Sequence, residues 1–377
     1  MPRTLKKTAS LYVAYSLLTV THALFVASRR IIHPETHFCL LRQLIRRLVR
    51  LKRASIHLLR TSLHPLIPYK PKPRLSKKRK MRNSVIIEAL TPKIGRLQNY
   101  DYKHLGNDKS VHEHLPFEGV GISIVIPSYN QGQFIERTLT SVLNQSYPQL
   151  ELFVQDNHST DQTAAVLERY QHRLTGCFIE KDSGQSEAIN RGFARSSEEI
   201  MAWLNSDDVL LPNTLFTVGS FFHHHPDVDV LYGNRLLIDE DDGEIGRWIL
   251  PKHDSEVLSW ADFVPQETLF WRRTMWLKIG GRIDESFRFA MDWDLLLRFR
   301  NAGAKFAHIP RFLGAFRVHD NQKTSAEINK TGTREMDIIR TRELGKSPRR
   351  REIRAALLPY TVAHMAADVK YALWGQK

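Results

Sequence analysis

At residues 203–210 the chain reads Trp203-Leu204-Asn205-Ser206-Asp207-Asp208-Val209-Leu210, a short apolar run that stops at two adjacent aspartates. Such a run predicts a buried strand, and acids at the carboxyl end of a buried strand lie where open α/β sheets bind their ligands. Carboxylate oxygens suit Mg²⁺ or Mn²⁺. Ser-Asp-Asp is also common in surface turns and at helix starts, so the pair alone leaves both interpretations open.

The preceding 80 residues alternate between β-rich runs and helical periodicity. The predicted strand and helix pairs are 121–127 with 131–145, 150–155 with 160–170, and 177–180 with 186–194, and a fourth strand covers 200–204. Four β-elements separated by helices predict a doubly wound, mostly parallel α/β sheet.

Polar residues follow each of these predicted strands. They are Ser128-Tyr129-Asn130, Asp156-Asn157, Asp182 and Asp207-Asp208. The carboxyl ends of parallel strands share one sheet edge, so we expect a cleft there for a base, a ribose and a metal-bound pyrophosphate. The first helix is opened by neither Gly-x-x-x-x-Gly-Lys nor Gly-x-Gly-x-x-Gly, which argues against a P-loop NTPase and a dinucleotide oxidoreductase.

The charge of the chain is unevenly divided. Residues 1–100 hold 22 Lys and Arg against two acids, a net charge of +20, whereas the whole chain carries +15, which leaves −5 for the other 277 residues. The only cysteines are Cys39 and Cys177. No disulfide framework is indicated, and a reducing compartment is expected.

The basic N-terminal region has the pattern of an arm that contacts a membrane. Residues 8–28 contain no Lys, Arg, Asp or Glu, and their length suits either a helix that spans a bilayer or one that lies in its interface. Residues 38–60 combine leucines at helical spacing with seven Lys and Arg, the pattern of a basic amphipathic helix. We therefore predict a membrane-associating helical arm over 1–65 and a basic, Pro-containing linker over 66–119. A packed helix with a solvated charged face is the alternative for 38–60.

Three stretches resemble, in their order and spacing, the motifs of family 2 glycosyltransferases. They are Ile124-Val125-Ile126-Pro127-Ser128-Tyr129-Asn130, Val154-Gln155-Asp156-Asn157-His158-Ser159-Thr160-Asp161 and the Trp203–Asp208 run. These enzymes have the GT-A fold and invert the configuration of the transferred sugar. The resemblance covers about residues 120–320. It implies a GT-A domain over 120–326, with a Rossmann-like nucleotide-binding half and an acceptor half, followed by a C-terminal helical extension over 327–377.

The resemblance assigns donor-binding roles in the first half of the domain. It implies that Pro127 and Asn130 line the nucleotide pocket, that Asp156 accepts a hydrogen bond from the base, and that Asp182 and Gln185 lie near the donor. In the motif that takes the place of the family's DxD, the first acid is Ser206. Asp208 is therefore expected to be the direct metal ligand, with Asp207 contacting the ribose or the metal shell. A turn or helix start is the structural alternative for Asp182.

The second half of the domain is expected to supply the chemistry. The resemblance puts the general base at Asp292, in Met291-Asp292-Trp293-Asp294, where it would take a proton from the acceptor hydroxyl. Asp294 is expected to have a structural or acceptor-positioning role. Phe263–Arg273 is predicted to be a strand whose Gln266 and Glu267 face the acceptor.

A loop near the end of the domain, Phe316–Thr324, is expected to close over the leaving group. The resemblance implies that His319 of this loop reaches the metal or the diphosphate, and the neighbouring Arg317 and Lys323 are expected to neutralise phosphate. A structural role is the alternative for His319. His223–His225 is read as a polar helix end without a metal role.

These observations predict a metal-dependent glycosyltransferase of the hexosyltransferase type, which uses Mg²⁺ or Mn²⁺. Its donor is a nucleotide sugar, with UDP as the expected nucleotide, and its acceptor is a saccharide or a lipid-linked molecule of cell-surface polysaccharide or glycolipid biosynthesis. The expected location is the cytoplasmic face of a membrane, with an anionic surface as partner and with peripheral attachment or a single N-terminal anchor.

Two alternatives compete with this reading. A nucleic-acid-binding protein is suggested by the basic arm, but the arm's leucines argue against a nucleic-acid partner. The other is a catalytically inactive sugar-binding homologue, which the presence of Asp208 and Asp292 makes less attractive.

Overall fold

The computed structural model describes residues 119–319, 322 and 331–374. The predicted arm over 1–65, all of the predicted linker except Gly119, and Lys323 lie outside the described residues. In the part of the chain that is described, no helix is both long and apolar enough to cross a bilayer.

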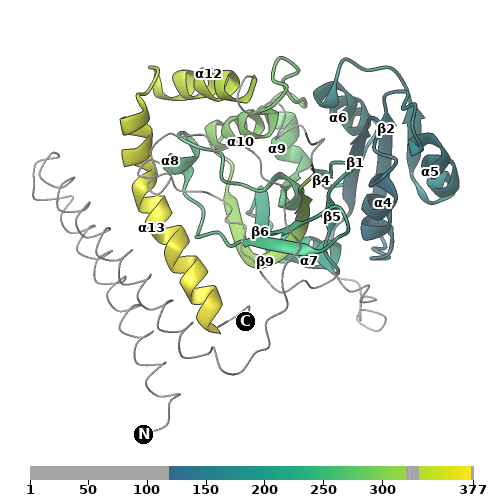
Figure 1. Cartoon of the computed structure of the whole chain (residues 1–377), viewed down its shortest axis with the longest axis horizontal. Helices are drawn as coiled ribbons and strands as arrows, with labels where there is room; N and C mark the ends of the chain where they lie inside the picture. The colour runs from purple at the N-terminus through teal and green to yellow at the C-terminus, as the bar shows by residue number, and fades with distance from the viewer. Residues whose placement is uncertain (1–118, 320–321, 323–330, 375–377) are drawn as a thin grey trace, which may run out of the picture. The chain divides into compact units, whose positions relative to one another are not determined.

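The first half of the described chain alternates strands and helices as the sequence predicts (Figure 1). Its elements are β1 (Ile122–Ser128), α4 (Ile135–Leu143), β2 (Leu150–Asp156), α5 (Thr163–Tyr170), the short 3₁₀ helix η1 (Gln171–Arg173), β3 (Gly176–Ile179), α6 (Gln185–Ala194) and β4 (Ile200–Trp203). The strands lie in the order β3-β2-β1-β4, and every pair among them is parallel. This is the predicted Rossmann-like half.

The second half extends the same sheet with mixed pairing. Its elements are β5 (Val209–Leu210), α7 (Thr214–His224), β6 (Val230–Ile238), β7 (Glu244–Trp248), α8 (Ser255–Leu258), η2 (Gln266–Thr268), β8 (Phe270–Arg272), α9 (Arg273–Lys278), α10 (Met291–Asn301) and β9 (Phe306–Arg317). From β4 the order continues β8-β6-β9-β5, and β7 pairs antiparallel with residues 235–238 of β6, beyond the residues that pair with β8. Strand β8 is antiparallel to both β4 and β6, whereas β6 and β9 are parallel. Parallel pairing therefore dominates only the first half.

The predicted strand over Phe263–Arg273 is much shorter in the structure. Only Phe270–Arg272 is strand, and Gln266–Thr268 form a 3₁₀ turn directly after Pro265. Proline has no N–H for a strand ladder, and its fixed φ favours a turn at this point.

Helices cover both faces of the sheet, and the alternation of side chains along β1 separates two cores. Ile122, Ile124 and Ile126 pack with residues of α4, α5 and α7. Val125 points to the opposite face and packs with residues of α6, α9 and α10. Successive side chains of a strand point to opposite faces, so one apolar strand supplies both layers of the doubly wound fold.

Two helices follow the sheet, α12 (Thr333–Leu344) and α13 (Arg350–Trp374), in the region predicted to be a helical extension. Helix α13 passes beside α8 (Figure 1). The rings of Tyr360 and Phe263 are 4.6 Å apart, and Arg247 Nη1 donates to Tyr371 Oη over 2.7 Å. These contacts join α13 to the sheet domain.

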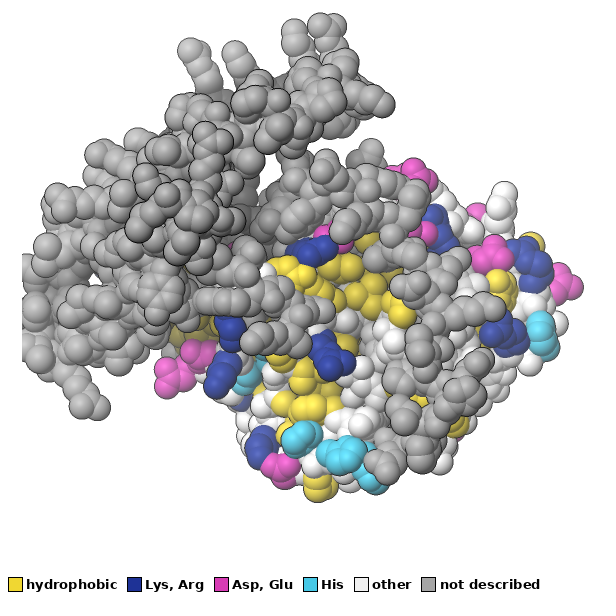
Figure 2. Space-filling view, turned by 90° about the horizontal axis from the view of Figure 1, so that it is seen from below, with side chains coloured by type: hydrophobic (Ala, Val, Ile, Leu, Met, Phe, Trp, Pro, Cys, Tyr) yellow, Lys and Arg dark blue, Asp and Glu magenta, His cyan; other side chains and the backbone are white. Residues whose placement is uncertain are grey.

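Figure 2 looks at the molecule from below. On the part of that face that is coloured, hydrophobic side chains lie among basic, acidic and histidine side chains. Phosphate backbones are bound by surfaces on which Lys and Arg are clustered. The coloured part of this face has no such uniform charge.

Helix α6 lies unusually close to β1, because Gly192 faces Val125. A Cβ atom built at Gly192 would overlap both Cγ atoms of Val125, which is fully buried. The backbone of α6 therefore approaches the sheet to a distance that only glycine allows.

We expect Gly192→Ala to lower the free energy of unfolding by about 1–3 kcal/mol through overpacking, against the gain of up to about 1 kcal/mol that alanine brings in a helix. The measurement is denaturant unfolding followed by circular dichroism. As the control, Val125→Ala removes the methyl groups that clash, so adding it to Gly192→Ala should recover part of the loss. A Gly192→Ala protein as stable as the wild type would contradict the close approach.

Candidate active site

The polar segments after β1, β2 and β4 meet at one edge of the sheet. In the strand register Ser128 lies opposite Asp156, and Asp156 lies opposite Ile179. The N–H of Leu204, just after β4, donates to the Val125 carbonyl over 3.0 Å. The shared edge that the sequence predicts is therefore present.

His319, which directly follows β9, also lies at this edge. Strand β9 pairs antiparallel with β5, which places the end of β9 beside the two aspartates. His319 Nε2 lies 3.0 Å from Asp207 Oδ2. The histidine side chain is buried, whereas the Asp207 side chain keeps 20% of its surface exposed. An accessible carboxylate and an imidazole thus lie side by side at the end of the central strands.

Arg317 holds the segment Asn205–Asp208, which we call the aspartate loop. Its backbone N–H donates to Asp208 Oδ1 over 2.9 Å, and its Nε donates to the Asp207 carbonyl over 2.8 Å. Nη1 donates to the Asp239 carbonyl over 2.9 Å, and Nη2 pairs with Asp242. The Arg317 side chain is fully buried. The structure therefore corrects the expectation that Arg317 faces the diphosphate, since its guanidinium is used to hold the aspartate loop.

Asp208 is a buried acid rather than an accessible one. It is 1% exposed, and its Oδ1 and Oδ2 accept hydrogen bonds from the Arg317 N–H and from Asn205 Nδ2, the latter over 3.3 Å. Burial raises its pKa well above the usual range, and the negative charges of Asp207 and Glu267 add to this effect. The role of Asp208 as a metal ligand stays a prediction, and Asp207 has the more accessible carboxylate, beside His319.

Several acids of this region interact with Arg235, a cation that the sequence analysis did not single out. Arg235 of β6 forms an ion pair with Glu267, with Nε 2.7 Å from Oε1. Its guanidinium lies between the rings of Trp248 and Phe316, 5.0 and 4.7 Å from their centroids.

The acidic neighbours of Arg235 stabilise its charged form. Burial would lower its pKa, but the charges of Glu267, Asp208 and Asp262 raise it. The available signal in the sequence was one arginine inside the otherwise apolar and polar-neutral strand Val230–Ile238.

A divalent cation fits the chemistry of this edge. Among the described residues, no three His, Cys, Asp or Glu side chains lie close enough to hold a metal ion by themselves. The Asp207–His319 pair supplies one oxygen and one nitrogen ligand, and the negative charge of Glu267 lies close enough to raise the pKa of neighbouring Asp208. Mg²⁺ usually binds proteins through one or two carboxylates together with substrate phosphates and waters, so a partial site of this kind suits a metal that arrives with a diphosphate.

Asp292 and Asp294 occupy different environments although both lie in the first turn of α10. Asp294 is fully buried and forms ion pairs with Arg298 and Arg342 at 2.8 and 2.5 Å. Asp292 is half-buried, and its Oδ1 accepts the Trp293 N–H over 2.9 Å. Asp294 is therefore in a structural position, whereas Asp292 is the more accessible acid.

Asp262 is a second acid near Asp292 that the sequence did not reveal. It is half-buried, and its Oδ1 accepts the Val264 N–H over 3.1 Å. Burial and the negative charge of Asp292 raise the pKa of Asp262 well above its usual range. Two carboxyl groups that repel one another's ionisation are typical of sites that handle protons.

The expected base-binding residues are organised around a turn. Asp156 is 1% exposed and accepts from both the N–H and the hydroxyl of Ser159, at 2.8 and 2.6 Å. Ser159 Oγ in turn accepts the N–H of Asn130, whose Oδ1 accepts the Thr160 N–H over 2.8 Å. Asp156 and Asn130 are thus brought together with buried Pro127 nearby in the chain, and their contacts with a base stay a prediction.

Asp182 and Gln185 lie on either side of Gly184, the N-cap residue of α6. Asp182 Oδ1 accepts the Gly184 N–H over 2.9 Å, an Asx turn just before the helix, so the structural alternative describes it at least in part. Gln185 Nε2 donates to Asn205 Oδ1 over 2.7 Å, which joins α6 to the aspartate loop. Asn205 lay inside the predicted motif, yet only the fold indicates that it links Gln185 to Asp208.

Gln266 and Glu267 are both buried, in contrast to the expectation that they face an acceptor. Gln266 Nε2 donates to the Trp203 carbonyl over 2.8 Å, and Glu267 is occupied by Arg235. Their positions are set by the 3₁₀ turn after Pro265, which turns both side chains towards β4 and β6. We therefore correct their role to support of the aspartate loop and of Arg235.

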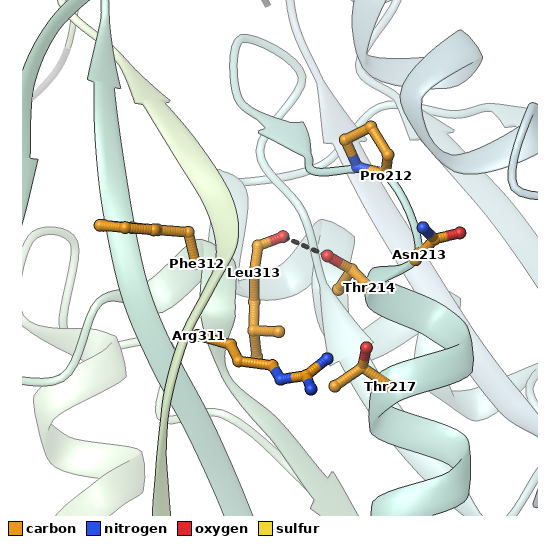
Figure 3. Close-up of a pocket in the computed structure, with 7 residues that line it drawn as sticks. All are labelled: Pro212, Asn213, Thr214, Thr217, Arg311, Phe312 and Leu313. Carbon is orange, nitrogen blue, oxygen red and sulfur yellow. Dashed lines mark hydrogen bonds between the residues drawn. The ribbon is translucent and has the colours of Figure 1, made fainter. Parts of the chain in front are cut away.

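A pocket at the start of α7 lies away from these residues (Figure 3). It is lined by Pro212, Asn213, Thr214, Thr217, Arg311, Phe312 and Leu313. Thr214 Oγ1 donates to the Leu313 carbonyl over 2.6 Å, which joins α7 to β9 at its wall. None of the predicted site residues lines this pocket.

Known proteins resemble this chain in sequence. It is 28% identical over 218 residues to an uncharacterized glycosyltransferase of Rickettsia typhi, an alignment that covers 55% of this chain and 67% of the relative. A putative teichuronic acid biosynthesis glycosyltransferase, TuaG of Bacillus subtilis, is 38% identical over 90 residues, which cover 23% of this chain and 36% of the relative. The second alignment thus spans about a third of the relative.

The fold also has a counterpart of known structure. S. aureus TarS, residues 1–349 in complex with UDP-GlcNAc, superposes with a TM-score of 0.50 at 18% identity, over 68% of this chain and 76% of TarS. This likeness confirms the predicted GT-A fold. Residues 123–282 match the family model described as glycosyl transferase family 2. This region of the chain therefore belongs to glycosyl transferase family 2.

Proposed function

We propose that this glycosyltransferase is metal-dependent and inverting, and that it moves a hexose-type sugar from a UDP-sugar to a saccharide or lipid-linked acceptor. The observation that carries the proposal is the accessible Asp207 carboxylate 3.0 Å from His319 at the edge where β1, β2 and β4 end. An oxygen and a nitrogen ligand at a helix- and strand-lined edge suit a metal-bound diphosphate.

Asp292 is the group we propose as base. The acceptor hydroxyl loses its proton as its oxygen attacks the anomeric carbon, and the bond from that carbon to the diphosphate oxygen breaks on the opposite side. One such displacement inverts the anomeric centre. Asp292 is half-buried, whereas Asp294 is fully buried, and this difference in exposure supports the assignment of Asp292 as the proton acceptor.

Asp207 and His319 are proposed to hold the leaving diphosphate through Mg²⁺ or Mn²⁺. When bound, such an ion supplies positive charge that stabilises the oxygen released from the sugar. The role of Asp208 is to orient the loop, because its oxygens accept from the Arg317 N–H and from Asn205. The positive charge of Arg235 offsets the repulsion among the nearby buried acids Asp208, Glu267 and Asp262.

The class of substrate is supported by the relatives. TuaG is named for teichuronic acid biosynthesis, a cell-surface polysaccharide pathway, and TarS was solved with UDP-GlcNAc. Synthesis of a cell-surface polysaccharide or glycolipid from a UDP-sugar is therefore the substrate class that we propose. A release assay across nucleotide sugars, with Mn²⁺ present, tests it, and release of nucleotide from none of them would refute the enzyme assignment.

Attachment to the cytoplasmic face of a membrane is proposed from the sequence of the arm. The +20 charge of residues 1–100 suits an anionic surface, and the leucines among the basic residues of 38–60 suit its headgroup boundary. Acceptors that are lipid-linked would then be presented beside the catalytic domain.

Replacing Asp207 should remove the metal-dependent part of donor binding. We expect Asp207→Asn to weaken binding of UDP with Mn²⁺ by more than about 100-fold, since losing even a residue that only supports a metal ligand costs roughly 10- to 100-fold. Calorimetry measures this directly. Asp208→Asn is the matched comparison, because it leaves an oxygen to accept the Arg317 N–H, and it should weaken binding less. The opposite ranking would return the ligand role to Asp208.

Replacing Asp292 should impair the reaction and leave donor binding intact. Loss of a general base costs about 10² to 10⁴ in rate, so Asp292→Asn should lower kcat by that factor. Asp294→Asn should instead lower the thermal midpoint, because Arg298 and Arg342 would lose their partner. If Asp294→Asn silences the folded enzyme and Asp292→Asn leaves kcat unchanged, the base is Asp294.

Deleting residues 1–80 should abolish binding to anionic vesicles while the remaining chain stays folded and active in nucleotide release. Vesicle flotation with anionic and with neutral lipid measures the difference, and added salt should weaken the anionic binding of the full chain. A truncated chain that still floats with anionic vesicles, or a full chain that prefers duplex DNA to them at the same salt, would overturn the proposed location.

A further inference from the structure

The segment that leads into α10 is held by a carboxylate from a distant helix. Glu335 of α12 is buried, and its Oε1 accepts the N–H of Arg288 over 2.9 Å. Its Oε2 accepts the N–H groups of Phe289 and Ala290 over 2.8 and 2.9 Å. One carboxylate thus satisfies three consecutive backbone donors.

These donors stand at the start of the helix that carries Asp292. Ala290 is the N-cap residue of α10, and no side chain of its own segment caps the helix. The free N–H groups at a helix start need acceptors, and a negative charge there is favoured by the helix dipole. Glu335 therefore acts as a cap supplied from outside the helix, with Asp292 two residues beyond the last amide that it binds.

Helix α12 also contacts α10 further along its length. Arg342 pairs with Asp294, and Glu343 pairs with Arg300 at 2.6 Å. The guanidinium of Arg340 lies 5.3 Å from the ring centroid of Trp293. Arg342 and Arg340 thus contact the first turn of α10 and Glu343 contacts its end. Glu335 is the acid of α12 that binds the amides of residues 288–290, directly before the helix.

We propose that Glu335 is a positioning residue for the reaction, which sets the place of Asp292 by fixing residues 288–290. The inference rests on the proposed function, because it assigns Glu335 to the base of that reaction. It brings α12, which lies beyond the matched residues 123–282, into the active site. A base must be held within a fraction of an ångström of its working position, and a small displacement costs a large factor in rate.

The test compares Glu335→Gln with Glu343→Gln in the full chain. Both changes replace a buried carboxylate of α12 by an amide of the same size, one at the start of α10 and one at its end. In Glu335→Gln an NH₂ group must face at least one of the backbone N–H groups. Turnover is measured with the nucleotide sugar found in the release assay, UDP–Mn²⁺ binding by calorimetry, and backbone exposure by hydrogen exchange of residues 288–290. All assays are run below the unfolding temperature of each variant.

We expect Glu335→Gln to lower kcat on the order of 10²-fold, with unchanged KM for the donor and unchanged UDP–Mn²⁺ binding. Exchange at residues 288–290 should become faster. Glu343→Gln should leave kcat and this exchange near the wild-type values even where it lowers the thermal midpoint. A role in stability alone would move the two midpoints and leave both kcat values unchanged.

The failures can be told apart. If the wild-type chain releases nucleotide but Glu335→Gln keeps its kcat, or if Glu343→Gln loses as much, the Glu335 assignment is wrong and the proposed function stands. If the wild type releases nucleotide from no sugar donor, the proposed function fails and the role of Glu335 falls with it.

Discussion

The hydrogen bond from the Arg317 N–H to the buried Asp208 carboxylate joins the two halves of the sheet at the candidate site. The donor lies at the end of β9 and the acceptor lies just after β4, so the bond brings together segments that are 109 residues apart. The Arg317 guanidinium then holds the carbonyls of Asp207 and Asp239. A buried carboxylate left without such donors would be costly, and the position of Asp207 and His319 at the surface of this cluster depends on it.

Negative charge is the second constraint on this region. Glu267, Asp208 and Asp262 stabilise the charge of Arg235, and Asp207 and Glu267 raise the pKa of Asp208. Burial and this mutual repulsion favour the protonated forms of Asp208 and Asp262. A site with more buried acid than base suits a function that brings in a cation, as the proposed metal-bound nucleotide diphosphate would.

The start of α10 shows how the proposed base, Asp292, can be positioned by contacts with distant residues. Asp294 is locked by two arginines, and the three amides before the helix are locked by Glu335. Asp292 lies between these two fixed points and remains half-buried. An acid that must exchange a proton with a substrate needs this combination of a fixed backbone and an accessible carboxylate.

The sequence by itself determined the alternation of strands and helices in the first half and the sheet edge at which polar residues gather. Both follow from local periodicity and from the geometry of parallel strands. It also indicated the family through motifs, and it singled out Asp207, His319 and Asp292 as candidates. These are short-range properties, which a linear pattern carries.

Only the tertiary structure decided which of these side chains are accessible. It buried Asp208 and Arg317, turned Gln266 and Glu267 inward after Pro265, and brought Arg235, Asp262 and Glu335 to the site from separate elements. Asp207 and Asp208 are adjacent and chemically identical, so no local rule separates them. They differ because Asp208 faces the end of β9 and accepts the Arg317 N–H, whereas Asp207 faces His319. That distinction exists only once β5 and β9 have paired.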